Sequence, residues 1–165
     1  MTKRTLFVDD WRFKKFPVET SLADACKELS DFQTVSLPHD WMIYQVSDLY
    51  ETSRGFYVKE FTCHKETLKH YELYFEGVYM DNTLYLNGEE IFTWPYGYSQ
   101  FEVDLTDFVK EGENTIWVKN VYELPNSRWY PGSGIYRNVW LVQRPAVHLT
   151  TDGGYLAAEK GTDDW

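Results

Sequence analysis

Hydrophobic and polar residues alternate with period two in several short segments after Val35, a pattern typical of β-strands with one buried face. Between Tyr71 and Glu76, for example, every second residue is a large apolar one. Further strands are predicted over Phe56–Phe61, Ser99–Val103, Thr115–Val121 and Ile135–Val142. Roughly seven or eight short strands with no alternating βα pattern predict an all-β fold, an antiparallel sandwich or jelly roll.

Turn and helix signals complete this pattern. Asn87-Gly88 separates Thr83–Leu86 from Glu89–Phe92, and Asn-Gly supplies the two positive φ angles of a type I′ hairpin turn. Apolar residues with helical spacing follow Ser21, which is a suitable cap for a short helix before Phe32. Asp104–Lys110 fits a one-turn connector helix. The predicted sandwich therefore includes one or two short helices.

Length and charge narrow the classes of function. The chain has 165 residues, enough for one ordinary domain, whereas a (β/α)₈ barrel needs about 250. Its formal net charge is −10 and it has no basic run, which disfavours nucleic acid as a partner. No stretch approaches the roughly 20 apolar residues of a membrane span, and the first five residues are largely polar. We therefore expect no membrane association and a cytoplasmic protein.

Aromatic residues make up 18% of the chain and are the outlier in its composition. They favour strands, and the polar atoms of Tyr and Trp suit sugar or protein surfaces. Cys26 and Cys63 have no Cys-x-x-Cys or His partner spacing, so we expect two buried free thiols. The sequence predicts no metal site and no cofactor.

Three stretches together resemble the amino-terminal sugar-binding domain of glycoside hydrolase family 2, especially its β-galactosidases. They are Leu37–Trp41, Phe75–Gly88 and Asn126–Leu141. Their order and spacing match too, the third is the most specific, and the likeness extends from about Trp11 to Leu141. It implies a jelly roll of the galactose-binding-domain-like type over residues 1–144. Residues 145–165 then look like the start of a truncated immunoglobulin-like domain, with a first strand over Ala146–Thr150.

The resemblance also implies that catalysis and the shaping of the substrate pocket belong to different domains. In such enzymes a (β/α)₈ barrel carries two Glu residues that hydrolyse the glycoside with retention of configuration. We can assign no catalytic residue to this chain. It is expected to be a non-catalytic domain that shapes the substrate pocket and braces the barrel. Its expected partners are a galactoside-like carbohydrate, its own downstream sandwich and barrel domains, and further copies in a homo-oligomer.

There are three substrate-binding candidates: the family pattern indicates Asn120, and the chemistry of their side chains indicates Arg128 and Trp129. Asn120 matches the position of a family Asn or Asp that hydrogen-bonds a sugar hydroxyl, although an Asn can also end a strand by bonding its own backbone. Arg128 and Trp129 could hold hydroxyls and stack on a sugar, or could pack against the barrel. A second family Asn has no counterpart before Gly55, which leaves the identity of the substrate open.

Other residues of these stretches have structural interpretations. His39 and Asp40 could form a proton relay, but a capped turn that fixes Trp41 in the core is the preferred interpretation. Gly134 is expected to need special backbone freedom. Arg137 is expected to be at least half-buried beside a carboxylate.

Two alternative functions stay open from the sequence. The acidic, aromatic-rich sandwich could be an independent lectin-like carbohydrate-binding module. It could also be a structural domain in which Trp94–Tyr98 and Arg128–Tyr130 make subunit contacts. The aromatic loop Trp94–Tyr98 fits either a sugar-stacking platform or packing at the rim of an enzyme.

Overall fold

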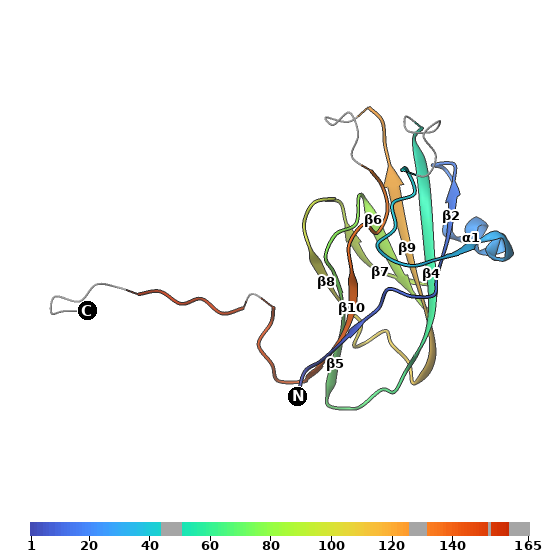
Figure 1. The fold of residues 1–165 in the computed structure, drawn as a ribbon. Helices are drawn as coiled ribbons and strands as arrows, with labels where there is room; N and C mark the ends of the chain where they lie inside the picture. Colours follow the sequence, from blue (N-terminus) through green and yellow to red (C-terminus); the bar gives the residue numbers. More distant parts are fainter. Residues whose placement is uncertain (44–50, 126–131, 152, 159–165) are drawn as a thin grey trace.

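Two antiparallel sheets pack face to face in the computed structural model, which describes residues 1–43, 51–125, 132–151 and 153–158 (Figure 1). Within these residues the smaller sheet has four strands in the order β1-β10-β5-β8. The larger sheet has six, in the order β3-β2-β4-β9-β6-β7. This confirms the predicted β-sandwich with few helices.

The strands and helices have the following bounds. The small sheet comprises β1 (Lys3–Leu6), β5 (Lys69–Phe75), β8 (Phe101–Asp104) and β10 (Val139–Pro145). The large sheet comprises β2 (Trp11–Phe16), β3 (Gln33–Val35), β4 (Ser53–Cys63), β6 (Asn82–Leu86), β7 (Glu89–Trp94) and β9 (Gly112–Tyr122). One α-helix, α1 (Leu22–Lys27), is followed by a 3₁₀ turn, η1 (Leu29–Asp31). None of the described helices is long and apolar enough to cross a membrane.

The main core lies between the sheets and consists of the alternate residues that the period-two pattern singled out. Tyr71, Leu73 and Phe75 of β5 are at most 1% exposed, and they face Ile116 and Val118 of β9, which are fully buried. Because β4 and β9 pair along 11 residues each, they form the long central ladder of the large sheet. This ladder carries Asn120 to the end of the sandwich where the candidate site lies.

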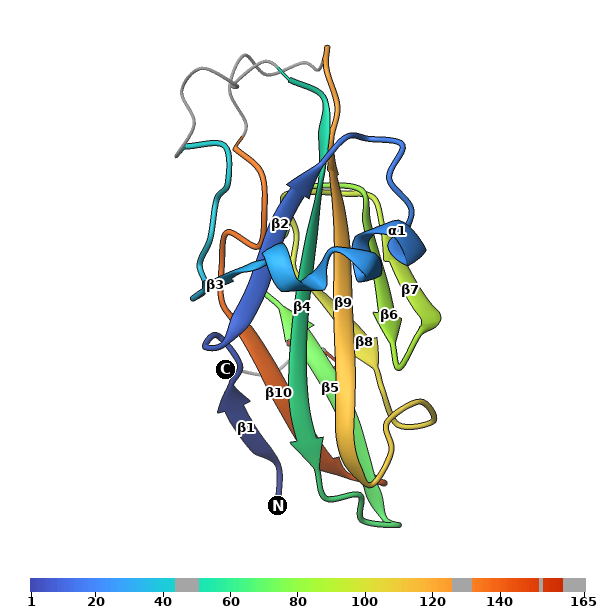
Figure 2. The same ribbon diagram turned by 90° about the vertical axis from the view of Figure 1, so that its right-hand side faces the viewer.

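A second, smaller core lies on the outer face of the large sheet, under α1 (Figure 2). It contains Phe16, Phe32, Phe56, Val58, Trp117 and the one fully buried residue of the helix, Ala25. The Ser21 hydroxyl accepts a hydrogen bond from Asp24 N at 3.1 Å, which confirms the predicted helix cap. Cys26 points away from this core and is exposed, so the prediction of two buried thiols holds only for Cys63.

The sequence predictions of individual elements were right where the signal is local. Asn87 and Gly88 have φ angles of +53° and +88° and join β6 to β7, as the hairpin motif predicted. Asp104–Lys110 contains a single turn rather than a helix; it is closed by the bond from Val109 N to Leu105 O at 2.8 Å. The sequence did not predict β1 or β2.

The strand expected over Ala146–Thr150 does not form among the described residues. A strand needs a neighbour with which to share hydrogen bonds. Here the β5–β10 pairing ends with one further bond, from Ala146 N to Leu68 O at 3.0 Å. The described segment after β10 leads away from the sheets (Figure 1), and most of its side chains are exposed. The proposed domain boundary at 144/145 stays a prediction.

Candidate functional site

The three stretches that carry the family resemblance meet at one end of the sandwich. Trp41 N donates to Ser133 O at 2.9 Å, and His39 N donates to Ile135 O at 2.8 Å. Gly134 and Tyr79 exchange two backbone hydrogen bonds of 3.0 Å. Residues that are 55 to 96 positions apart in the sequence therefore form one hydrogen-bonded unit. Figure 2 shows the segments before residue 43 and after residue 132 side by side.

Gly134 is the close-packed centre of this unit. Its φ is +131°, a region that side chains rarely adopt, which confirms the predicted need for backbone freedom. A Cβ atom here would lie 2.4 Å from the carbonyl oxygen of His39 and 2.5 Å from the hydroxyl of Tyr57. Both distances are well below van der Waals contact, so only glycine fits.

The Asp40 carboxylate ties two of the segments together. Its Oδ1 accepts hydrogen bonds from Met42 N at 2.9 Å and from Ser133 N at 3.0 Å. The first bond makes a capped turn of the kind that Asp favours, and the following residue, Trp41, is only 4% exposed. This supports the preferred interpretation of the motif, a turn that fixes Trp41 in the core.

Asn120 lies inside the unit rather than on its surface. The residue is fully buried, and its Oδ1 accepts a hydrogen bond from Trp41 Nε1 at 3.1 Å. Its amide nitrogen donates to the carbonyl oxygen of Tyr79 and lies 3.4 Å from Ser133 Oγ. The amide thus bonds three different segments of the domain and not only its own strand. Whether it also contacts a sugar in a larger enzyme stays a prediction.

His39 and Tyr57 form a half-buried polar pair beside Gly134. His39 Nδ1 lies 2.8 Å from the Tyr57 hydroxyl, and the imidazole packs 4.8 Å from the ring of Phe13 between centroids. Burial lowers the pKa of His39, partly opposed by the negative charge of Asp40, which raises it. Burial also raises the pKa of Tyr57 well above 10. Both groups are therefore neutral near pH 7 and act as hydrogen-bonding groups.

A pocket of about 330 Å³ opens beside this unit. Its wall includes His39, Trp41 and Phe13, together with Lys15 and Gln33 from β2 and β3. The Lys15 ammonium group lies 5.8 Å from the ring centroid of Trp41 and 2.6 Å from a carboxylate oxygen of Glu51. Aromatic carbon and a few polar groups in a pocket of this size suit a small polar ligand with one apolar face.

The remaining sequence candidates are distributed differently. Arg128 and Trp129 lie outside the described residues, so their predicted contacts stay predictions. Arg137 is exposed, and its guanidinium lies 5.4 Å from the centroid of the Tyr136 ring. The predicted burial of Arg137 is therefore wrong, because an aromatic ring at the surface holds this side chain. In the aromatic loop, Tyr96 and Tyr98 are 58% and 42% exposed.

A cluster of His70, Glu72 and His148 lies elsewhere, on the small sheet, and the sequence did not indicate it. His70 and Glu72 are two residues apart on β5, and period two places them on one face. His148 follows β10, 76 positions after Glu72. Only the antiparallel pairing of β5 with β10 brings the three together.

Comparisons with known proteins agree with this architecture. Residues 7–145 match the family described as glycosyl hydrolases family 2, sugar binding domain. The chain is 34% identical to Beta-galactosidase BoGH2A from Bacteroides ovatus over 171 aligned positions, which cover 93% of this chain and 20% of that protein. A solved glycosyl hydrolase family 2 member from Bacteroides cellulosilyticus has 32% identity and a TM-score of 0.74, covering 86% of this chain and 21% of that one. The fold also matches Bacteroides uniformis beta-glucuronidase 2, with a TM-score of 0.75 at 24% identity, covering 93% and 19%.

The chain belongs to the sugar-binding domain family of the family 2 glycosyl hydrolases. It spans about a fifth of the length of the curated relative and of the two solved structures just described. The region that it shares with those enzymes is thus a β-sandwich domain and not the greater part of the enzyme.

Proposed function

We propose that this domain forms part of the wall of the substrate pocket in a β-galactosidase-like hydrolase and braces the catalytic barrel. In this proposal the barrel supplies both Glu residues of a retaining mechanism, and the sandwich carries out no proton or glycosyl transfer. The substrate is a galactoside-like carbohydrate, and the partners are the enzyme's own further domains and other copies of it. The cytoplasm is the proposed compartment.

The observation that supports this proposal most is the convergence of the family-like segments on Gly134. These segments build a rigid corner, because Asp40, Asn120 and Gly134 all bond or pack against backbone. A rigid corner with a pocket beside it can hold a loop or a side chain at a fixed place. Neutral His39 and Tyr57 fit this positioning role better than a proton relay.

Asn120, Arg128 and Trp129 remain the proposed substrate-binding residues. For Asn120 two routes to the sugar are open, a direct hydrogen bond or the positioning of Trp41 through the bond to its indole. A double-mutant cycle in the enzyme that contains this domain separates them. If the route is indirect, Asn120→Ala lowers kcat/KM in the parent but adds little in Trp41→Phe, which already lacks the indole N–H. If the contact is direct, the two losses add.

The domain alone provides the main test. We expect no hydrolysis of chromogenic galactosides by the purified chain after removal of host enzyme, and no heat of binding with galactosides in calorimetry. One or two contacts at the edge of a pocket do not offset the cost of immobilising a sugar. Turnover by the chain would overturn the proposal. Binding with a Kd of about 1 mM or tighter would favour the lectin-like alternative instead.

A further inference from the structure

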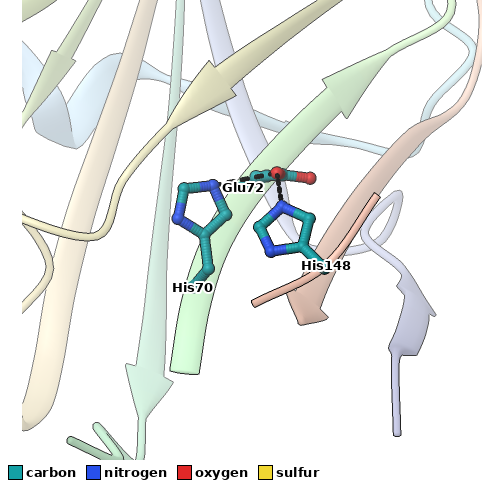
Figure 3. Close-up of side chains that lie close together, drawn as sticks. All are labelled: His70, Glu72 and His148. Atoms are coloured by element: carbon teal, nitrogen blue, oxygen red, sulfur yellow. Dashed lines mark ion pairs between the residues drawn. The ribbon is translucent and has the colours of Figure 1, made fainter. Parts of the chain in front are cut away.

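The small sheet carries a cluster of metal-type ligands that has no part in the proposed sugar pocket (Figure 3). His70 and Glu72 belong to β5, and His148 lies in the segment after β10. The candidate ligand atoms of these three side chains all lie within 4.8 Å of one another. In Figure 3 both imidazole rings direct a nitrogen at the same carboxylate.

The two separations between the carboxylate and the histidines are close to those in a zinc site. Glu72 Oε1 is 2.9 Å from His70 Nε2 and 3.6 Å from His148 Nε2. In a tetrahedral zinc site, bonds of about 2.0–2.2 Å place neighbouring ligand atoms about 3.3 Å apart. The two observed separations lie on either side of this value. Two imidazoles and one carboxylate form a ligand set that binds zinc with a further position open.

The other nitrogen of each imidazole already has a partner. His148 Nδ1 lies 2.8 Å from Pro145 O, and a carbonyl can only accept, so Nδ1 carries the proton in the neutral ring. His70 Nδ1 lies 2.9 Å from Thr106 Oγ1, with Asp104 Oδ1 3.8 Å away. Such bonds orient metal-ligating histidines. They leave Nε2 of His148 with a free lone pair, whereas the Thr106 hydroxyl can donate to His70 Nδ1, so that His70 Nε2–H donates to Glu72 Oε1 and a bound metal replaces this proton. Both rings are thus held in the orientation that ligation requires.

The charge around the cluster also suits a divalent cation. Arg144 Nε donates to Glu72 Oε2 at 2.7 Å, which leaves Oε1 to face the histidines. Three carboxylates, those of Glu72, Glu102 and Asp104, lie near the histidines, and Arg144 pairs with the first two. Glu102 Oε1 is buried and has no hydrogen-bond donor among the described residues.

The exposure of the three side chains and the packing of the two imidazole rings are consistent with a metal site. The side chains of His70, Glu72 and His148 are 23%, 7% and 13% exposed. The cluster is thus largely dry yet open at the His70 side. The centroids of the two imidazole rings are 4.8 Å apart and the ring planes are tilted by 36°, so the two rings pack against each other.

We propose that His70, Glu72 and His148 bind a single divalent transition metal of the zinc class. Nε2 of each imidazole and Oε1 of the carboxylate are the ligands, and the metal cross-links the segment after β10 to β5. This inference is independent of the sugar-related function, because it concerns another face of the domain.

Zinc chloride titrated into the chain, freed of metal by a chelator and then exchanged into a non-chelating buffer, tests the proposal by calorimetry. We expect one zinc ion per chain in the parent and at least about tenfold weaker binding in His70→Gln and in His148→Gln. His64→Ala is the matched control, because this histidine is 87% exposed and pairs only with Glu111 among the described carboxylates. It should bind like the parent. Magnesium, which prefers an octahedral set of oxygen ligands, should not bind at the same concentration.

Cobalt(II) and thermal unfolding give independent readouts. Cobalt bound by two imidazoles and one carboxylate should produce visible absorption bands in the parent and in His64→Ala, and not in His148→Gln. Zinc should raise the unfolding temperature of the same two proteins only. His148 lies outside both sheets, so His148→Gln should unfold like the metal-free parent. Parent-like zinc binding in both His→Gln variants, an equal loss in His64→Ala, or no binding to the parent would each overturn the proposal.

Discussion

The indole of Trp41 is held by the side-chain amide of Asn120, although the two residues are 79 positions apart: Nε1 donates to Oδ1 at 3.1 Å. Both side chains are buried, and the same amide donates to the carbonyl of Tyr79. Buried polar groups of this kind stabilise a fold mainly because leaving one without a partner is costly. Asn120 is therefore as much a structural residue of the corner as a candidate ligand for sugar.

Replacing Asn120 by Ala should lower the free energy of unfolding by about 1–3 kcal/mol, because it leaves the buried Trp41 N–H without its acceptor, whereas the Tyr79 carbonyl keeps Gly134 N and Ser133 Oγ as donors. Denaturant unfolding followed by tryptophan fluorescence measures this. Ser133→Ala is the control, since its hydroxyl lies 3.4 Å from the amide and also bonds Tyr79 O. It should cost clearly less, and equal losses would contradict the central role given to the amide.

Gly134→Ala should destabilise the domain by more than about 4 kcal/mol, because it combines an unfavourable φ with a clash against His39 O. Gly88→Ala separates the two effects. Gly88 also has a positive φ, +88°, but a Cβ there meets no atom within 4 Å. We expect a loss of only about 1–2 kcal/mol, the cost of the left-handed conformation alone. Chemical denaturation of both variants checks the difference.

The stability of the domain should depend on His39 in mildly acidic solution. Because burial lowers its pKa below 6.5, the unfolded chain binds more protons than the folded chain just below that value. The contribution of His39 is therefore complete above about pH 6.5 and declines as the pH falls through it. Unfolding free energies measured from about pH 7.5 to 5.5 should thus fall more steeply in the parent than in His39→Gln. Parallel curves would show that His39 is not linked to folding in this range.

The two cysteines should differ in reactivity. Cys26 is exposed on α1, whereas Cys63 at the end of β4 is only 3% exposed. Alkylation of the folded chain should add one group, at Cys26, and a second only after unfolding. Peptide mass spectrometry identifies the modified residue. Burial raises the pKa of both thiols, so the labelling of Cys26 should be slow at neutral pH and faster in alkaline solution.

The sequence predicted those elements whose signal is contained in a few neighbouring residues. Asn87-Gly88 specifies its turn through two φ angles, and Ser21 caps its helix within one turn. The strand β1 carries no such signal, because all four of its residues are exposed and, in the part of the chain that the structure describes, it pairs only with β10, more than 130 positions away. Neither a hydrophobic face nor a turn marks it.

The sequence predicted the local conformation of several site residues, but not the contacts between the segments that form the site. The turn at Asp40 and the special backbone of Gly134 follow from residue type. Their contact with Tyr79 does not, since it depends on pairings between distant segments. The same holds for His70 and His148. A search for metal ligands by local spacing cannot find two residues that only the register of β5 and β10 brings together.

The lengths of the strands have a consequence for how copies of the chain can meet. The outermost strands of the two sheets, β1, β8, β3 and β7, have four, four, three and six residues, whereas the interior strands β4 and β9 have 11 each. Backbone groups without a strand partner are thus confined to short stretches at the sheet edges. The edge strand β1 also carries two charged residues, Lys3 and Arg4. Such borders discourage growth by strand addition. We therefore expect copies of this domain to meet through side-chain surfaces rather than through strand edges.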